Sequence, residues 1–542
     1  MRPRDLSRLE SRVFDLLIVG GGVYGLACAY EGASRGLSVA LVDAGDFGSG
    51  TSFNHQKTAH GGLRSLGSGD LRRARESIHE RRALARIAPW LLRPLPFLVG
   101  TYRSLARSRS ALRAAFRLDA WLGRRRNDGV EPELHLPPPR LVSRAATLRL
   151  FSGIRGDGLT GGAQWYDYQM VESDRLTVAF AEAADRCGAT LASHAAAVEA
   201  ITEDGRIVGM QVRDALSGAA VAVRARLTLN AAGAHAGTVM AMFGVKRPFP
   251  LVKAMNLVTS RPASDIGLAA PGPSGRMLTL VPWRGRAIVG TSQSAGFVQP
   301  GDTAVGPEEV AAFIADANHA FPALQLLLTD VSLVHRGVVP AVAGRHGGPE
   351  LKPLPDVFDH AADGAAGALT VAGVKYTTAR GVAERVIDLA GARLGQPLTP
   401  SRSGTTTLPG AGLADHDALA IEAARGRGVD LTPDAIRHLV GLYAEATPTL
   451  VALIAERPEL AAPVAAAVPT LGAEVVHAIR HEMALRLADI VVRRTGLGSA
   501  GRPAPEALRA CARLAAAELA WSPARTEEEI ALTSRVYDWA SI

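Results

Sequence analysis

A glycine-rich turn near the amino terminus constrains the fold more than any other feature of the sequence. Gly20, Gly22 and Gly25 lie between an apolar segment, residues 14–19, and an alanine-rich segment, residues 23–35. This order predicts a buried strand, a tight turn and a helix. The first glycine permits the turn, the second lets backbone approach a pyrophosphate, and the third lets the helix pack closely on the strand. We therefore expect a dinucleotide at the positive amino end of the helix.

Asp43 supplies the second part of this pattern. It closes another apolar segment, residues 37–43, which predicts a parallel strand buried on both faces. A carboxylate at this place can accept hydrogen bonds from both hydroxyls of an adenosine ribose. Two later turns favour FAD over NAD, because the segments ending at Gly233 and around Gly373 resemble turns that flavoproteins place against the FAD. A helix begins after Gly373, and a helix start beside the flavin would stabilise negative charge on the reduced ring.

The length of the chain predicts several domains. Its 542 residues are too many for one hydrophobic core, and 47% hydrophobic with 21% charged residues is typical of globular proteins. A linker rich in proline, glycine, serine and threonine, residues 397–412, precedes a region with helical patterns only. We expect an α/β fold, in which residues 1–399 form a Rossmann-like FAD-binding domain interleaved with a mixed-sheet substrate domain. The cap of that domain covers approximately 80–160 and 245–345, and residues 400–542 form an all-helical domain.

An arginine-rich stretch follows the predicted strand, turn, helix and second strand. The net charge is +8, and residues 70–126 are expected to be helical. Five arginines share one face at helical spacing: Arg103, Arg107, Arg109, Arg113 and Arg117. This face is either simply solvated or docks on an anionic membrane surface. Nucleic acid is not expected as a partner, because no aromatic platform or binding motif accompanies the charge.

Several segments, taken together, have the pattern of a known family. They are residues 20–25 with 35–37, residues 50–52 with 57–64, residues 282–283 with 290–291, residues 373–380, and, in the helical region, residues 408–410, 482–489 and 493–495. In these segments the chain resembles the FAD-dependent, quinone-linked glycerol-3-phosphate dehydrogenases of the D-amino-acid-oxidase-like superfamily. The resemblance covers nearly the whole chain. It implies oxidation of a secondary alcohol on a small anionic substrate, with hydride transfer to flavin N5 and a quinone as electron acceptor.

The resemblance also implies roles for individual residues. The family's substrate-contacting arginine corresponds to Arg64, and its lysine and threonine near flavin and substrate correspond to Lys375 and Thr377. Cationic side chains of this kind suit a phosphate group. The expected cofactor-binding residues are Gly20, Gly22, Gly25, Asp43, Thr51, Ser52, His60, Gly61, Val198, Gly233, Gly373, Lys375, Tyr376 and Thr377. His60 is either a base or a residue packed near the flavin.

Three positions depart from the family pattern. Ser65 replaces a tyrosine, Asn256 replaces a substrate-site histidine, and Val339 replaces an arginine. Loss of such an arginine would weaken phosphate binding by about 2–5 kcal/mol. Either Arg336, three residues earlier, substitutes for it, or the substrate differs. The alternatives are therefore an amine, amino-acid or 2-hydroxyacid oxidase or dehydrogenase of the same superfamily, and a non-catalytic flavin-binding protein.

The remaining features predict the cellular compartment and the absence of a metal site. Its three cysteines are widely spaced, which indicates neither a disulfide framework nor a zinc site and favours a reducing compartment. His477 and His481 are four residues apart but lack a third ligand, so no metal is expected. We expect no signal peptide and no membrane span, hence a cytoplasmic protein or one peripheral on the inner face of the cytoplasmic membrane. The oligomeric state stays open, and the region beyond residue 400 is expected to make no essential cofactor contact.

Overall fold

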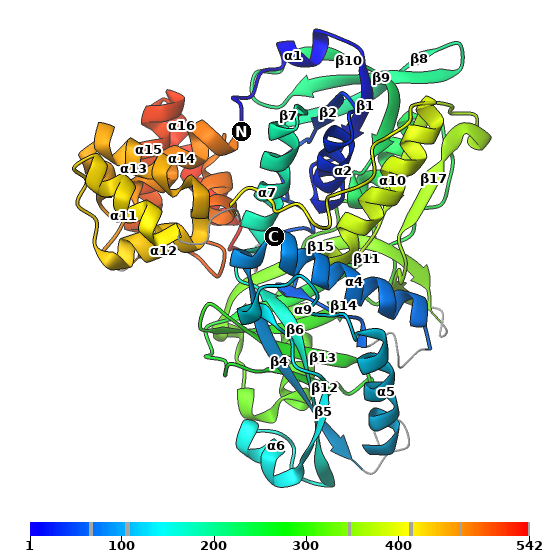
Figure 1. The fold of residues 1–542 in the computed structure, drawn as a ribbon, viewed down its shortest axis with the longest axis vertical. Coiled ribbons are helices and arrows are strands. Elements are labelled where there is room, and N and C mark those ends of the chain that lie inside the picture. Colours follow the sequence, from blue (N-terminus) through cyan, green and yellow to red (C-terminus); the bar gives the residue numbers. More distant parts are fainter. Residues whose placement is uncertain (64–68, 103–108, 345–347, 411–415, 467, 540–542) are drawn as a thin grey trace.

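Two β-sheets and a separate group of helices make up the molecule (Figure 1). The computed structural model describes residues 1–63, 69–102, 109–344, 348–410, 416–466 and 468–539. Both sheets draw their strands from distant parts of the chain before residue 373, whereas the helical group is formed by its last quarter. The candidate site lies between the sheets, at strand ends of the first and on strands of the second.

The first sheet has the topology of a dinucleotide-binding fold. Its order is β17-β18-β10-β1-β2-β7, with β8 and β9 continuing from β10 as an antiparallel meander. The pairs of β1 with β2 and β10, of β2 with β7, and of β10 with β18 are all parallel. The strands are β1 Phe14–Val19, β2 Val39–Val42, β7 Thr190–Ala192, β8 Ala195–Glu203, β9 Arg206–Asp214, β10 Ala220–Asn230, β17 Asp356–Asp359 and β18 Ala368–Ala372. The predicted first strand is thus present with the expected bounds.

Helices cover both faces of this sheet. On one face lie α2 (Val23–Ser34), α7 (Ser173–Arg186) and α10 (Ala379–Leu394), and on the other lie α1 (Ser7–Glu10) and α8 (Ala236–Met242). Alternate residues of β1 point to opposite faces, so that Leu16 and Ile18 join the first core and Leu17 joins the second. This double burial explains the continuous apolar runs seen in the sequence.

The second sheet is mixed and larger. Its order is β16-β15-β11-β14-β13-β12-β4-β6-β3, and β5 pairs with β6. The strands are β3 Thr58–Ala59, β4 Leu92–Tyr102, β5 Arg140–Ser143, β6 Leu159–Met170, β11 Leu251–Thr259, β12 Gly267–Pro271, β13 Met277–Trp283, β14 Arg286–Gln293, β15 Val331–Ala343 and β16 Pro349–Leu351. The helices beside it are α4 Leu71–Ile87, α5 Arg109–Leu122, α6 Arg144–Leu150 and α9 Pro307–Ala320.

The expectation that residues 70–126 are helical is wrong in its middle part. The strand β4 lies there between α4 and α5, and it pairs with β6 over its whole length. Pro94 and Pro96 within β4 cannot continue a helix. Partner strand β6 is distant in the sequence, so the arginine-rich helical pattern on both sides concealed this strand.

The helical domain packs against the second sheet. It contains α11 His416–Gly426, α12 Pro433–Tyr443, α13 Thr447–Glu456, α14 Gly472–Glu482, a π-helical turn Asp489–Arg494, α15 Pro505–Leu519 and α16 Pro523–Arg535. Phe97 and Trp283 of the sheet share one apolar core with Ile490 of this domain. The domain and the sheet therefore form a continuous hydrophobic contact.

One helical stretch has a length and composition that would also suit a membrane span. Pro433–Glu456 covers α12 and α13, and half of its most apolar window is buried inside the protein. The stretch is interrupted at Ala444, where φ is 43°. Leu439, Leu450 and Ile454 on it belong to the core of the helical domain.

Candidate active site

A cavity of about 1030 Å³ lies where the two sheets meet. The turns that follow β1, β2, β10 and β18 form one side of it, and β11, β13, β14 and β15 of the second sheet form another. In open parallel sheets, ligands bind beyond the carboxyl ends of the strands where the strand order reverses, here between β1 and β10. The cavity occupies that place.

The turn between β1 and α2 is built for close approach of a ligand. Gly20 has φ +112°, and a Cβ there would lie 2.6 Å from the carbonyl oxygen of Ala231. A Cβ on Gly25 would lie 1.8 Å from the carbonyl oxygen of Gly20, so this glycine allows the helix to contact the turn. Gly22 differs, because a Cβ there would meet only the Ser52 hydroxyl, at 3.3 Å. Its open side faces the cavity, where a pyrophosphate would lie at the start of α2.

Asp43 is held in place by this turn. Its carboxylate accepts hydrogen bonds from the backbone N–H of Gly21, at 2.5 Å, and of Gly45, at 2.7 Å. Burial nevertheless raises the pKa of Asp43 to about 6, because the two hydrogen bonds only partly offset the loss of hydration. The side chain lines the cavity next to Gly20 and Gly22.

The segment from residue 50 to residue 63 crosses the cavity as a strap between the two sheets. The Ser52 hydroxyl accepts a hydrogen bond from the Val23 N–H, at 2.9 Å, which ties the strap to the amino end of α2. The Thr51 hydroxyl donates to the carbonyl oxygen of Val338 in β15, at 3.1 Å. Lys57 is fully buried further along the strap and donates to the carbonyl oxygen of Phe53. Contacts within the protein therefore hold the strap in place, independently of any ligand.

His60 on this strap lies beside a buried carboxylate. Its Nδ1 is 3.5 Å from Oδ2 of Asp167 in β6, and 42% of its side chain is exposed. Arg81 and the Gly61 N–H both donate to the other carboxylate oxygen. Burial alone would raise the pKa of Asp167, but the His60 hydrogen bond and the Arg81 charge lower it to about 2. Asp167 is thus an ionised group that orients the imidazole.

The turn after β18 brings a cation to the same cavity. Lys375 donates from Nζ to the Ser77 hydroxyl of α4, at 2.5 Å, and Tyr24 donates to its backbone carbonyl. Burial, reinforced by the Arg73 charge, lowers the pKa of Lys375 to about 8. The Thr377 hydroxyl accepts a hydrogen bond from the His60 N–H, at 3.1 Å, which connects this turn to the strap.

Arg336 is the cation of the second sheet. It lies on β15 and lines the cavity, and burial lowers its pKa. Its Nη1 is buried and has no hydrogen-bond partner within the described part of the chain. Val339, three residues later, packs in an apolar cluster with Val252 and Ala341.

Neutral polar groups of the second sheet line the cavity as well. Asn256 accepts a hydrogen bond from the Thr291 hydroxyl, at 2.8 Å, and Gln56 accepts one from the Thr279 hydroxyl, at 2.6 Å. These groups offer donors and acceptors for hydroxyl groups without adding charge.

The pattern of the FAD dependent oxidoreductase family, DAO, matches residues 15–389, and that of the C-terminal domain of alpha-glycerophosphate oxidase matches residues 401–526. A protein of Mycobacterium tuberculosis named glycerol-3-phosphate dehydrogenase 2 is 31% identical over 97% of this chain and 88% of its own length. The chain belongs to this family of FAD-dependent oxidoreductases. FAD is its cofactor, and the family resemblance inferred from the sequence is confirmed.

Three other proteins are similar to this chain in sequence or in fold. The glycerol-3-phosphate dehydrogenase of Synechocystis is 29% identical over 91% of this chain and 90% of its own length. A crystal structure of glycerol-3-phosphate dehydrogenase from Bacillus halodurans, complexed with FAD, has the same fold, with a TM-score of 0.77, 22% identity and coverage of 99% of this chain and 96% of its own. Glycine oxidase from Geobacillus kaustophilus shares the fold over 74% of this chain and 100% of its own, with a TM-score of 0.51 and 19% identity.

Most of the site residues that the sequence predicted line the cavity described here. Those that line it are Gly20, Gly22, Asp43, Thr51, Ser52, His60, Gly233, Arg336, Gly373, Lys375, Tyr376 and Thr377. Gly25 and Gly61 lie behind that lining and act through the backbone. Arg64 and Ser65 lie outside the described residues.

Among the described residues, Val198 is the one expected residue for which the structure shows no place at the cavity. It lies on β8, in the meander beyond β10, where 40% of it is exposed, and it is not among the residues that line the cavity. The start of β8 is hydrogen bonded to the loop after β2, where the Ala195 N–H donates to the Asp43 carbonyl, so Val198 stays a prediction.

Several residues of the site were missed. Asp167, Ser77 and Gln56 each position or line the site, and Val492 and Arg493 reach the cavity from the helical domain. A carboxylate in the apolar run of β6 was a detectable signal for Asp167, because a charge in a buried strand requires a partner. Ser77 and Gln56 carry no such signal, since their importance depends on which strand or helix faces them.

Proposed function

We propose that this chain oxidises sn-glycerol 3-phosphate to dihydroxyacetone phosphate. Support comes from relatives of that name over nearly the whole chain, and from a cavity that places two cations beside a dinucleotide turn. The observation that carries the proposal is Arg336, whose buried Nη1 has no partner among the residues the structure describes. An unpartnered guanidinium in a partly desolvated cavity favours an anionic ligand, because leaving it unpaired costs free energy.

The residues around the first sheet fit FAD. Gly22 and Gly233 leave open space where a Cβ would stand, so the pyrophosphate can lie against backbone at the start of α2. Asp43 lies where it would accept the ribose hydroxyls, and Ser52 fixes the first turn of the helix. FAD, when bound, supplies the acceptor for the hydride that leaves the substrate carbon. The chain then has to hold the substrate and remove the hydroxyl proton.

His60 is proposed as the group that takes this proton. It faces the cavity, and its Nδ1 lies beside ionised Asp167. A carboxylate at Nδ1 keeps a proton on that nitrogen and leaves Nε2 as the acceptor. The positive charge that forms on the imidazole is then stabilised by the same carboxylate. This arrangement favours the role of a base over that of a residue which only packs near the flavin.

Arg336 and Lys375 are proposed to bind the phosphate from two sides. The family's arginine position holds Val339, which is buried in an apolar cluster and cannot provide this contact. Arg336 restores the charge from the same strand, and its planar guanidinium can bind two phosphate oxygens at once. Arg64 is proposed as a third contact on the basis of the family pattern. Gln56, Asn256 and Thr291 are suited to the glycerol hydroxyls.

The decisive experiment is anaerobic reduction of the bound flavin by candidate substrates. We expect glycerol 3-phosphate to bleach the flavin absorbance, and we expect glycine, proline and lactate not to do so. An Arg336→Gln variant with a full complement of FAD should need much more glycerol 3-phosphate. Bleaching by an amino acid instead would favour the amine oxidase alternative, and no bleaching by any of these compounds would favour a flavin-binding protein without this activity.

The electron acceptor and its location are a separate proposal. A quinone acceptor follows from the family resemblance, and a quinone requires access to a membrane. Arg113, Arg117 and Arg124 are exposed on and after α5, and Trp121 beside them is 57% exposed. Basic side chains attract anionic lipid at about 1 kcal/mol each, and tryptophan favours the lipid interface. We propose that this region docks on the inner face of the cytoplasmic membrane. Binding to vesicles with and without anionic lipid, with Arg113→Glu/Arg117→Glu as the variant, tests it.

A further inference from the structure

A buried cluster of charges joins the helical domain to the dinucleotide-binding fold. It consists of Asp46, from the loop after β2, and of Asp489, Arg493 and Arg494, from the π-helical turn Asp489–Arg494. We call these four residues the Asp46 clamp. Asp46 and Arg494 have fully buried side chains, and Asp489 and Arg493 are nearly so. Family resemblance singled out Arg493 and Arg494, but the catalytic site described above uses neither.

Each member of the clamp forms an ion pair with at least one other member. Arg494 donates two hydrogen bonds to the Asp46 carboxylate, from Nη2 at 2.6 Å and from Nη1 at 2.9 Å. Arg493 donates from Nε to Asp46 at 2.6 Å and from Nη2 to Asp489 at 2.7 Å. Two guanidinium groups therefore balance two carboxylates. A buried arrangement of this kind holds one geometry, since loss of any member leaves an uncompensated charge.

The loop that the clamp grips also carries the ribose carboxylate. Asp46 follows Asp43 and Gly45 in the loop after β2, and Gly45 donates to the Asp43 side chain. The same turn is held from behind by His194, whose N–H donates to the carbonyl oxygen of Gly45 and whose imidazole pairs with Asp489 at 2.8 Å. The helical domain thus holds this loop at two points.

Arg493 contacts the cavity as well as the loop after β2. Together with Val492 and Val536, it lines the large cavity, whose lining also includes Asp43, Ala44 and Gly45. The backbone around it is π-helical, a conformation that is rare and that often marks functional positions. Its side chain therefore connects a cavity wall to a buried anchor.

From this geometry we infer that the helical domain completes the adenosine end of the FAD site, with Arg493 and Arg494 as positioning residues that act through Asp46. The clamp keeps the loop after β2 in the conformation in which Asp43 faces the ribose. This role is independent of the substrate, and it replaces the expectation that residues beyond 400 make no essential cofactor contact. It concerns retention of FAD rather than the oxidation step.

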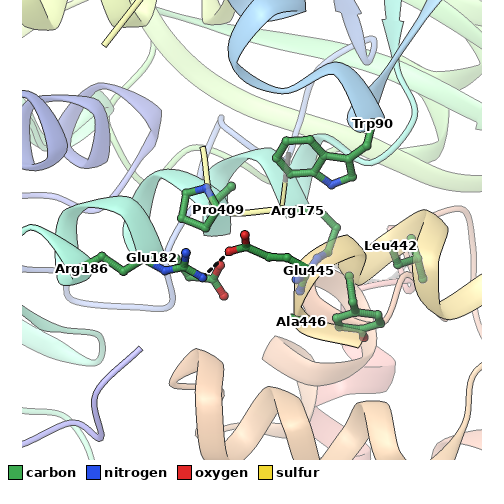
Figure 2. Close-up of a pocket in the computed structure, with 11 residues that line it drawn as sticks. Trp90, Arg175, Glu182, Arg186, Pro409, Leu442, Glu445 and Ala446 are labelled. Carbon is green, nitrogen blue, oxygen red and sulfur yellow. Dashed lines mark ion pairs between the residues drawn. The ribbon is translucent and has the colours of Figure 1, made fainter. Parts of the chain in front are cut away.

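Two other domain-crossing ion pairs provide matched controls. Arg175 of α7 pairs with Glu482 at 2.6 Å in a buried position, and Arg186 of α7 pairs with Glu445 at 2.5 Å in a more exposed one. Figure 2 shows Arg186 and Glu445 meeting across this boundary, with Arg175 nearby. Neither arginine lines the large cavity. The Arg186 pair is the independent control, because Glu482 also lies 3.9 Å from Nε of Arg494 in the clamp.

The experiment measures FAD affinity and apoprotein melting separately in the full-length chain. Asp46→Asn and Arg493→Gln should bind FAD at least about tenfold more weakly than the wild type, as expected for coupling between a cofactor site and a neighbouring domain. Arg186→Gln should keep near wild-type affinity, and Arg175→Gln, whose partner Glu482 also contacts Arg494, should lose less affinity than Arg493→Gln. Arg493→Lys keeps the charge but lacks the second donor, and an intermediate loss of affinity is expected for it.

Two results would overturn the inference. One is unchanged FAD affinity in Arg493→Lys and Arg493→Gln, which decides the matter even if Asp46→Asn does not fold. The other is an equal loss of affinity in Arg186→Gln, which would show that FAD retention follows general domain contact. Failure of the proposed substrate is distinguishable from both, because glycerol 3-phosphate takes no part in these measurements.

Discussion

The two ends of the cavity differ in how they are prepared for their ligands. At the adenosine end, backbone geometry dominates: Gly20 and Gly25 have no room for a side chain, and Asp43 is already hydrogen bonded by Gly21 and Gly45. At the substrate end, charge dominates, since Arg336 has a buried nitrogen without a partner in the described structure. The first end is complete as a folded structure, whereas the second is completed by the ligand.

This difference explains where the chain departs from its family pattern. Backbone contacts allow little substitution, so the glycine turn and Asp43 match the family. Cations can be supplied from more than one position around a cavity, provided that a side chain reaches the same point. Val339 and Asn256 are such departures, and Arg336 lies on the same strand as Val339. A binding site can therefore keep its charge while it changes the residue that provides it.

The largest effect is expected from a substitution that disrupts the adenosine end of the cavity. Gly25→Ala places a Cβ 1.8 Å from the carbonyl oxygen of Gly20, so helix α2 must move away from the turn. We expect a loss of stability of at least about 3 kcal/mol and little folded protein. Gly22→Ala is the matched control, because its Cβ would meet only the Ser52 hydroxyl, at 3.3 Å, and should weaken FAD binding while leaving the apoprotein folded. Equal melting temperatures for the two apoproteins would contradict this account.

A smaller effect should be confined to the substrate end. Arg336→Gln is expected to lower kcat/KM for glycerol 3-phosphate roughly 30- to 100-fold, about 2–3 kcal/mol, by removing a partly buried phosphate contact. FAD content and melting temperature should stay close to wild type, since the guanidinium has no hydrogen bond or ion pair to lose among the described residues. Steady-state kinetics on FAD-saturated protein measures this. Unchanged kcat/KM would show that Arg336 does not contact the substrate.

The pH dependence of FAD binding sharpens the comparison further. Ionised Asp43 is the form that accepts ribose hydroxyls, and its pKa of about 6 means that protonation begins below that pH. FAD affinity should therefore be constant above about pH 7 and fall by up to about tenfold per pH unit below pH 6. Asp43→Asn should bind more weakly at neutral pH and show no such slope. Titration of apoprotein with FAD between pH 5 and 8 provides the measurement.

The smallest expected effect concerns Lys375. Its pKa is lowered to about 8, so the cation that attracts phosphate is lost progressively as the pH rises through that value. We expect KM for glycerol 3-phosphate to rise a few-fold between about pH 7 and 9, while FAD binding stays constant. Lys375→Arg stays charged over this range and should flatten the profile. A KM that does not change with pH in the wild type would argue against a phosphate contact.

The sequence predicted those parts of the site that depend on short-range order. The strand Phe14–Val19, the three glycines and Asp43 lie within thirty residues, and their spacing alone determines how they meet. The strand β4 was missed because its identity depends on β6, which begins 57 residues after β4 ends.

Sequence alone determined that this chain has a dinucleotide site on a parallel sheet, because glycine spacing and apolar runs fix local backbone geometry; the choice of FAD followed from the family pattern. Tertiary structure decided which cations face the ligand, which carboxylate orients His60, and that the helical domain reaches the cavity through Arg493. These contacts join residues from distant segments, such as Asp46 with Arg494 and Ser77 with Lys375. Their energies depend on distance and burial, and neither quantity is encoded in the spacing of residues along the chain.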